Sequence, residues 1–252
     1  MDPRANGGER YARLLEAARG LPPVTTAVAH PCDEVSLKGA VEAARLGLIA
    51  PILVGPPERI RGVAERAGLE ISEFPLTPSA HSHDSAEKAV ELVREGKAEA
   101  LMKGSLHTDE LMSAVVSRDT GIRTARRISH CFVMDVPGHK DPLIITDAAI
   151  NIAPDLEAKT DIVQNAIDLA HALLQPEVRV AILSATETVN PKILSTIEAA
   201  ALCKMADRGQ ITGGTLDGPL ALDNAIDEEA ASIKGIVSPV AGRANVLVAP
   251  DL

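Results

Sequence analysis

Three residues in the middle of the chain have the chemistry of an anion-binding turn. Lys103, Gly104 and Ser105 follow an apolar segment that is expected to be a strand, and a helical pattern begins at Glu110. Phosphate groups bind to lysine or arginine side chains and to the backbone N–H groups at the start of a helix. The spacing of a Walker motif is absent, so a solvent-exposed loop is the alternative interpretation.

A second stretch, from Gly213 to Asn224, carries two carboxylates where a strand is expected to lead into a helix. The sequence Asp217-Gly218-Pro219 predicts a sharp turn, because glycine is free in φ and proline fixes it. Asp217 and Asp223 flank that turn, and ligands of open α/β sheets bind at this edge. An ordinary turn followed by a helix cap is the alternative.

Other polar residues follow further predicted strands. Asp147 and Asn151 come after an apolar segment, and they either bind a polar ligand or cap the next helix. Lys234 is either a cation at a helix C-terminus or a second cation for phosphate. Arg123, in an arginine-rich loop, either clamps an anion or belongs to a solvated loop.

Several other kinds of site are disfavoured. His81 and His83 lie in a polar loop without a third ligand, so we predict no metal site there. Ser129 and His130 are adjacent on a predicted strand and point to opposite faces, which argues against a nucleophile–base pair. No GxGxxG dinucleotide fingerprint follows a strand.

Composition restricts the class of protein further. The 252 residues carry a formal net charge of −10, which disfavours nucleic acid as a partner. The window from Lys103 to Lys140 reverses that sign, with six Lys or Arg residues against four Asp or Glu residues. Three cysteines without CxxC spacing predict a reduced, cytoplasmic setting. The polar N-terminus predicts no signal peptide, and no apolar run approaches the ~20 residues that span a bilayer.

Short apolar segments that alternate with helical patterns position these residues, and they predict an α/β fold with a parallel sheet covered by helices. Strands are expected at 24–29, 51–54, 70–74, 98–102, 130–136, 143–146, 178–183, 210–216 and 245–249. Helices are expected at 10–19, 34–46, 59–67, 85–95, 110–116, 156–174, 191–206 and 224–233. The segments 130–136 and 143–146 are predicted to form a hairpin, which interrupts the alternation and places a domain boundary after residue 128.

Several short strings occur in a distinctive order. They are Leu101–Gly104 with His107 and Thr108, Ile145–Asp155, Gln210–Gly214, Asp217–Asp223, Ala230-Ala231, Lys234-Gly235 and Val240–Gly242. Together they resemble the phosphate acetyltransferase / phosphate butyryltransferase family. The similarity runs from about Val24 to the last residue, and the Met-Lys-Gly string resembles the butyryltransferase-like branch.

The resemblance implies two α/β/α domains of the isocitrate/isopropylmalate dehydrogenase type, residues 1–128 and 129–252, with a cleft between them. It implies a cytoplasmic homodimeric enzyme that transfers an acetyl or butyryl group reversibly between coenzyme A and inorganic phosphate, which gives an acyl phosphate. The partners are then acyl-CoA and phosphate, without nucleic acid or membrane. Coenzyme A is a substrate, and neither a cofactor nor a metal is implied.

The resemblance also implies residue roles. The catalytic residues are expected to be Lys103, His107 and Asp217. The substrate-binding residues are expected to be Gly104, Thr108, Arg123, Asp147, Asn151, Gly218, Pro219, Asp223 and Lys234. Lys103, His107 and Arg123 are expected to contact phosphate or the CoA diphosphate, whereas Asp147, Asn151 and Asp217 orient polar groups.

The chain also departs from the family pattern. Family members continue with a Gly-Asn segment, a lysine and a Ser-Arg-x-Asp-type stretch, none of which follows Leu252, and Asn245 stands where they usually carry Asp. We therefore expect the second domain to be C-terminally incomplete. Two alternatives stay open: a dehydrogenase on the same kind of fold, and a truncated, non-catalytic form that binds CoA.

Overall fold

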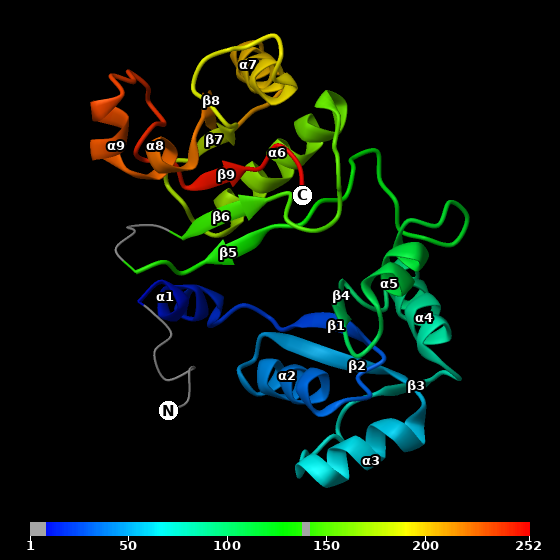
Figure 1. The fold of residues 1–252 in the computed structure, drawn as a ribbon. Coiled ribbons are helices and arrows are strands. Elements are labelled where there is room, and N and C mark those ends of the chain that lie inside the picture. Colours follow the sequence, from blue (N-terminus) through cyan, green and yellow to red (C-terminus); the bar gives the residue numbers. More distant parts are fainter. Residues whose placement is uncertain (1–8, 138–141) are drawn as a thin grey trace. The chain divides into compact units, whose positions relative to one another are not determined.

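The computed structural model describes residues 9–137 and 142–252. The chain divides into two compact units, Leu15–Ala125 and Arg126–Leu252, and the second also includes the beginning of helix α1 (Glu9–Ala18). Figure 1 shows the helices and strands of both units. The turn of the predicted hairpin, residues 138–141, lies outside the described residues, and the boundary between independently folding domains stays a prediction.

The unit Leu15–Ala125 is built on a parallel sheet of four strands in the order β3-β2-β1-β4. The strands are β1 (Val24–Ala29), β2 (Ile49–Gly55), β3 (Leu76–Pro78) and β4 (Ala100–Lys103). The helices that alternate with them are α2 (Glu34–Arg45), α3 (Pro57–Ala67), α4 (Ser82–Arg94) and α5 (Thr108–Val115). Helix α2 begins where the sequence predicts, because the Asp33 carboxylate accepts a hydrogen bond from Ser36 N at 2.8 Å.

Alternate residues of these strands enter two separate apolar clusters. On one face, Val28 and Leu53 pack with Leu37 of α2 and Ile60 of α3. On the opposite face, Ala27, Ala29 and Val54 of the strands pack with residues of the other two helices. These are Ala86 and Ala89 of α4 and Leu111 of α5. The unit is therefore an α/β/α sandwich, as the alternation of apolar segments predicts.

The unit Arg126–Leu252 contains a sheet of five strands in the order β5-β6-β9-β7-β8. They are β5 (Phe132–Met134), β6 (Leu143–Thr146), β7 (Arg179–Leu183), β8 (Thr215–Leu220) and β9 (Val246–Val248). Strand β5 is antiparallel to β6, as the predicted hairpin requires, and the other pairs are parallel. The helices are α6 (Leu156–Ala172), α7 (Leu194–Asp207), α8 (Leu222–Ile226) and α9 (Glu228–Ile233).

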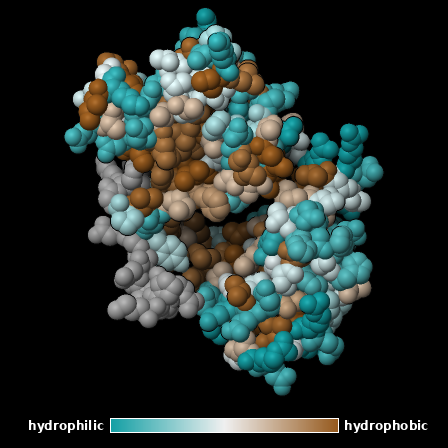
Figure 2. Space-filling model, in the orientation of Figure 1, coloured by the Kyte–Doolittle hydropathy of each residue, from teal (hydrophilic) through white to brown (hydrophobic). Residues whose placement is uncertain are grey.

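Helices cover both faces of this sheet as well. Val180 and Val246 face an apolar cluster with α6 and α7, whereas Ala181 and Leu247 face a second cluster with α8 and α9. Figure 2 shows that hydrophobic side chains also reach the surface. On the edge strand β5, the side chains of Phe132, Val133 and Met134 are 50%, 39% and 42% exposed.

The structure corrects three predicted elements. Residues 70–74 are not a strand; the short strand β3 follows them at Leu76–Pro78. The predicted helix 224–233 is two short helices that meet at Asp227, whose side chain caps the second one through Ala230 N at 2.8 Å. The strand expected at 210–216 is shifted along the chain and becomes β8.

That shift places Asp217-Gly218-Pro219 inside β8 and not in a sharp turn. Strand β8 lies at the edge of the sheet, where a proline need not donate to a neighbouring strand. The pairing between β7 and β8 is irregular next to this segment, between Ala181 and Leu183. Gly218 is required there, because a Cβ atom at this position would lie 2.7 Å from the carbonyl oxygen of Ile182.

Candidate functional site

The carboxyl ends of β1 and β4 meet at the point where the strand order reverses. From β1 the chain proceeds to β2 and β3 on one side, and then crosses to β4 on the other side. Ala29 and Lys103 are paired at the ends of the two neighbouring strands. In open α/β sheets, ligands bind outside the carboxyl ends of the strands at such a point.

Backbone hydrogen bonds hold the two strand ends together. Gly104 N donates to the carbonyl of Ala29 at 2.8 Å, and Ser105 N donates to the carbonyl of His30 at 2.9 Å. The Ser105 hydroxyl donates to that same His30 carbonyl at 3.0 Å and accepts from Cys32 N at 3.1 Å. The turn after Lys103 is thus fixed against the loop after β1, and a rigid turn can present its cation without further ordering.

The predicted cationic residues lie along this turn and the loop after the next helix. The Lys103 side chain is exposed at the end of β4, and its Nζ lies 3.4 Å from the carbonyl of Gly104. His107 and Thr108 are exposed at the start of α5, where His107 N donates to Glu110 Oε2 at 2.7 Å. Arg123 is exposed in the loop that follows α5. The sequence therefore places Lys103, Gly104, His107 and Thr108 in one continuous segment, with Arg123 farther along the chain.

Asp33 is the acidic residue closest in sequence to the end of β1, and its carboxylate accepts hydrogen bonds from Ser36. Hydrogen bonds from the Ser36 hydroxyl and from Ser36 N lower the pKa of Asp33, and the positive charge of Lys103 lowers it further. Cys32, beside it, has a raised pKa because its thiol is half-buried. A neutral thiol and a locally bonded carboxylate leave the positive charge of Lys103 available to an anion.

In the unit Arg126–Leu252, Asp147 and Asn151 contact each other. Asp147 is 5% exposed, and its Oδ1 accepts from the backbone N–H groups of Ala149 and Ile150, each at 3.0 Å. Its Oδ2 accepts from Asn151 N at 3.1 Å and from the Asn151 side chain. Burial alone would raise the pKa of Asp147, but these donors together hold that pKa below its ordinary value. The carboxylate is therefore ionised and fixes the loop after β6.

Asp217, Gly218 and Pro219 lie in β8, with Pro219 buried. Asp217 Oδ1 accepts from Gly218 N at 2.8 Å. Burial, together with the negative charges of Asp217 and Asp207, raises the pKa of the neighbouring Cys203 thiol to about 12. Cys203 is therefore a protonated packing residue and not a nucleophile.

Asp223 lies in the short helix α8 that follows β8, and Lys234 is the C-cap of α9. Lys234 forms an ion pair with Glu187, and Asn224 Nδ2 donates to the same Glu187 oxygen at 2.6 Å. The hydrogen bond to Glu187 is the main cause that raises the pKa of Lys234, with a smaller contribution from Asp223. Lys234, predicted to be a cation for substrate, has a carboxylate partner in this structure.

No group of three or more His, Cys, Asp or Glu residues that could hold a metal ion occurs in the described part of the chain. His81 and His83, expected in a polar loop, lie at the N-cap and in the first turn of α4, and both have other partners. His81 Nδ1 accepts from Asp84 N at 3.2 Å and caps α4, whereas His83 Nδ1 lies 2.9 Å from Glu110 Oε1. Over residues 9–137 and 142–252, no helix is long and apolar enough to cross a membrane.

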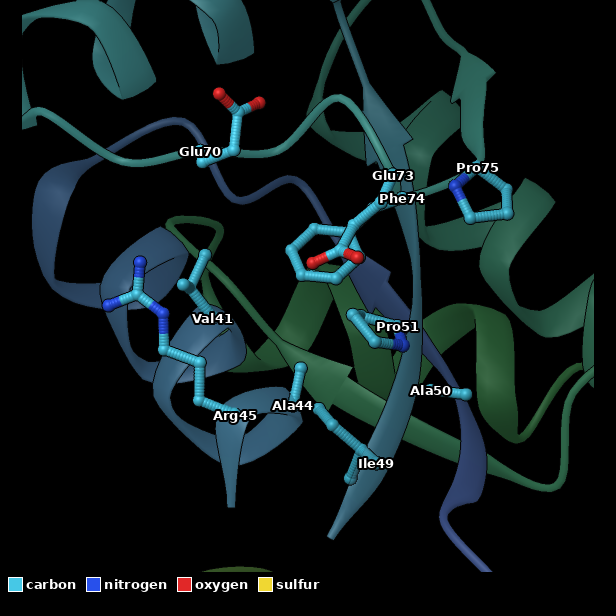
Figure 3. A pocket seen from close by; sticks show the side chains of 10 residues that line it. All are labelled: Val41, Ala44, Arg45, Ile49, Ala50, Pro51, Glu70, Glu73, Phe74 and Pro75. Carbon is cyan, nitrogen blue, oxygen red and sulfur yellow. The ribbon is translucent and has the colours of Figure 1, made fainter. Parts of the chain in front are cut away.

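A cavity of about 320 Å³ lies at the beginning of β2, and therefore away from the carboxyl ends of the strands. Figure 3 shows the Phe74 ring and Pro51 facing into it, with the Glu70 carboxylate directed away. Its other lining residues are Val41, Ala44, Arg45, Ile49, Ala50, Glu73 and Pro75. None of the predicted site residues lines it, so the cavity does not belong to the candidate site.

The predicted site residues therefore lie in separate groups, and each group belongs to one of the two units. Local sequence patterns missed two polar residues near the first group, His30 and Arg59. His30 directly follows β1, a strand-end position like that of Lys103 at the end of β4, and Arg59 lies in the first turn of α3. Glu187, the partner of Lys234, was also missed, because it lies in a loop with no distinctive spacing.

Comparisons with known proteins agree with the resemblance in the sequence. The family model described as phosphate acetyl/butaryl transferase matches residues 76–252. The phosphate acetyltransferase of Rhizobium meliloti is 67% identical over 243 residues, which cover 96% of this chain and 77% of that protein. The phosphate butyryltransferase of Clostridium acetobutylicum is 40% identical over 226 residues, with coverages of 90% and 75%. A branched-chain phosphotransacylase from Enterococcus faecalis V583 has a similar structure, with a TM-score of 0.74, 27% identity, and coverages of 90% of this chain and 79% of that one.

Proposed function

This chain belongs to the phosphate acetyl/butyryltransferase family, and we propose that, among the phosphate acyltransferases, it is one specific for the acetyl group. The proposal rests on one observation: the phosphate acetyltransferase of Rhizobium meliloti is 67% identical, whereas the phosphate butyryltransferase of Clostridium acetobutylicum is 40% identical. The dehydrogenase alternative is not favoured, because the relatives that span nearly the whole chain are named acyltransferases.

The reaction moves an acetyl group between sulfur and oxygen. The CoA thiolate attacks the carbonyl carbon of acetyl phosphate, a C–S bond forms, and the C–O bond to phosphate breaks, which releases inorganic phosphate. Negative charge develops on the carbonyl oxygen and on the leaving phosphate, so cations and N–H donors held beside them lower the barrier. The rigid turn after Lys103 supports assigning this role to Lys103, with His107 and Arg123 as further contacts to phosphate or to the CoA diphosphate.

The residues of the second unit serve two purposes in this proposal. The backbone N–H and the side-chain amide of Asn151 both donate to Asp147 Oδ2, which supports a role in holding the loop after β6. Asp217 has one oxygen bonded to Gly218 N, and its Oδ2 accepts no hydrogen bond from the described residues. That oxygen supports the assignment of Asp217 as the carboxylate that orients the reacting groups. Asp223 completes the set at the first turn of α8.

Coenzyme A is a substrate in this proposal, and the enzyme needs neither a metal nor a resident cofactor. We place it in the cytoplasm, where its three free cysteines stay reduced. We also propose a homodimer, since edge strand β5 exposes three apolar side chains and a row of backbone groups. Light scattering at several concentrations tests the dimer, and a constant monomer mass would contradict it.

The test of the activity follows free thiol release from acetyl-CoA and butyryl-CoA, with and without phosphate. We expect phosphate-dependent release that is faster with acetyl-CoA. Faster release from butyryl-CoA would contradict the acetyl preference. Thiol release at the same rate with and without phosphate would contradict the acyltransferase assignment. Calorimetry with CoA measures binding apart from turnover, and metal-dependent NAD reduction tests the dehydrogenase alternative directly.

A pair of matched variants tests the anion-binding turn. Lys103→Ala should weaken phosphate or CoA binding by about tenfold or more, because a charged hydrogen bond is lost. Lys97→Ala is the control, since Lys97 lies on the surface of the same unit, 2.8 Å from Glu95. Unchanged phosphate and CoA binding in Lys103→Ala would remove Lys103 from the site.

A further inference from the structure

His30 is a buried histidine at the carboxyl end of β1, in an uncommon backbone conformation. Its φ is +55° and its side chain is 3% exposed. Non-glycine residues adopt this left-handed region rarely, and such conformations gather at functional sites. His30 N donates to the Val54 carbonyl at 2.7 Å, which holds the loop after β1 against the end of β2.

The hydrogen bonds around His30 determine which ring nitrogen carries the proton. The Ser85 hydroxyl lies 2.9 Å from the carbonyl of His81. Because a carbonyl can only accept, Ser85 donates its one hydroxyl hydrogen to that carbonyl. His30 Nδ1, at 2.8 Å from Ser85 Oγ, must therefore donate to it, and Ser79 Oγ donates to Ser85 at 2.7 Å. The neutral ring then has an unprotonated Nε2, which accepts from Arg59 NH1 at 3.4 Å.

The surroundings keep the ring neutral. Burial lowers the pKa of His30, and the adjacent charge of Arg59 lowers it further. A histidine that is neutral at neutral pH can accept from an arginine, whereas a protonated one would repel it. His30 therefore orients the Arg59 guanidinium without neutralising its charge.

Among the residues that the structure describes, Arg59 has no carboxylate partner of the kind that surface arginines often have. It is exposed in the first turn of α3, and it forms no ion pair with any described carboxylate. Arg61, two residues along, pairs with Glu58 at 2.9 Å. Arg59 NH1 lies 3.4 Å from His30 Nε2, and Lys103 is paired with Ala29, the residue before His30, so both cations border the loop after β1.

We propose that Arg59, oriented by neutral His30, is a second cation of the anion site at Lys103, and that it binds a phosphate group of coenzyme A. Arginine is suited to this role, because its planar fork binds phosphate oxygens in pairs. His30 is then a positioning residue that acts through Arg59. The proposal rests on the proposed function, which supplies CoA as the ligand.

The test compares two arginine variants by calorimetry with CoA, dephospho-CoA and inorganic phosphate. Arg59→Met should weaken CoA binding by about tenfold or more, while Arg61→Met should bind as the unchanged protein does. A loss with CoA but not with dephospho-CoA identifies the ribose phosphate, and a loss with both identifies the diphosphate. Arg59→Met with unchanged affinity for CoA would overturn the proposal. So would a loss confined to inorganic phosphate.

Two further variants test the positioning role. His30→Gln retains an acceptor for Arg59 and should retain most of the CoA affinity, whereas His30→Leu should bind like Arg59→Met. Thermal melting first establishes that each variant is folded. In acetyl transfer, the loss in His30→Leu should raise the KM for CoA and spare kcat. An equal loss of CoA affinity in His30→Gln and His30→Leu would contradict the positioning role of His30. Because binding is measured directly, Arg59-dependent binding without acetyl transfer would contradict the proposed function and leave this inference intact.

Discussion

Gly104 donates its N–H to the Ala29 carbonyl at 2.8 Å, and a Cβ atom on Gly104 would lie only 2.4 Å from that same oxygen. The end of β4 can therefore lie against the end of β1 only because residue 104 has no side chain. The same contact fixes the position of Lys103 one residue earlier. The geometry of this strand end and the position of the Lys103 cation thus depend on one glycine.

Gly104→Ala should separate the ends of β1 and β4 and move Lys103. We expect CoA affinity to fall by at least about tenfold, as after loss of a charged hydrogen bond. Calorimetry with CoA measures it. The control is Gly47→Ala, at a position with φ +72° and no atom near a Cβ, which should cost stability without changing affinity. Equal CoA affinity in Gly104→Ala and the parent chain would show that the turn does not set the site.

The buried ion pair between α6 and α7 should be needed for stability. Lys159 Nζ lies 2.5 Å from Glu198 Oε2, and the two side chains are 5% and 12% exposed. Lys159→Met should lower the free energy of unfolding by about 3–5 kcal/mol, because it leaves a buried carboxylate unpaired. Lys159→Met with Glu198→Leu should recover most of that loss. Urea unfolding measures both, and a double variant as unstable as the single one would contradict this explanation.

Much of the fold follows from local patterns in the sequence. The Val- and Ala-rich segment 24–29 and the hairpin segment at 143–146 each give a strong local signal, and the structure confirms them. Either Asp33 or Ser36 could cap the helix that follows the first strand, and the structure shows Asp33 as the cap. Strands β3 and β8 were misplaced because Pro78 and Pro219 are ordinarily signs of a turn. An edge position in the sheet accommodates Pro219, and edge positions are set by tertiary pairing.

The candidate site could be predicted only in part, because some of its contacts also depend on tertiary structure. The strand-end rule identified Lys103, Gly104 and Asp147 from their neighbours in sequence. The contact between His30 and Arg59 joins residues 29 positions apart, and a third residue, Ser85, fixes the proton on the ring. No periodicity or short motif carries such a contact, so only the folded chain reveals it.

His30 should make stability depend on pH in a defined window. Its native pKa lies below the ordinary value of 6.5, so the unfolded chain binds more protons between those two values. The contribution is complete above pH 6.5 and is lost as the pH falls through the native pKa. Arg59 and His81 also lower that pKa, while Glu110 raises it. Urea unfolding from pH 5 to 8 should show a steeper loss in the parent chain than in His30→Gln. Identical slopes would contradict a neutral, buried His30.

Asp147→Asn should distinguish a loop-holding carboxylate from one that contacts substrate. Both oxygens of Asp147 accept from N–H groups, so an asparagine amide in their place would point its own N–H₂ at other donors. We expect the free energy of unfolding to fall by about 1–3 kcal/mol, with the KM for acetyl-CoA little changed where the chain is folded. Asp155→Asn is the control, because Asp155 caps α6 through Ala158 N and asparagine caps equally well. Normal stability with a raised KM would instead place Asp147 in contact with substrate, as the resemblance to the family implies.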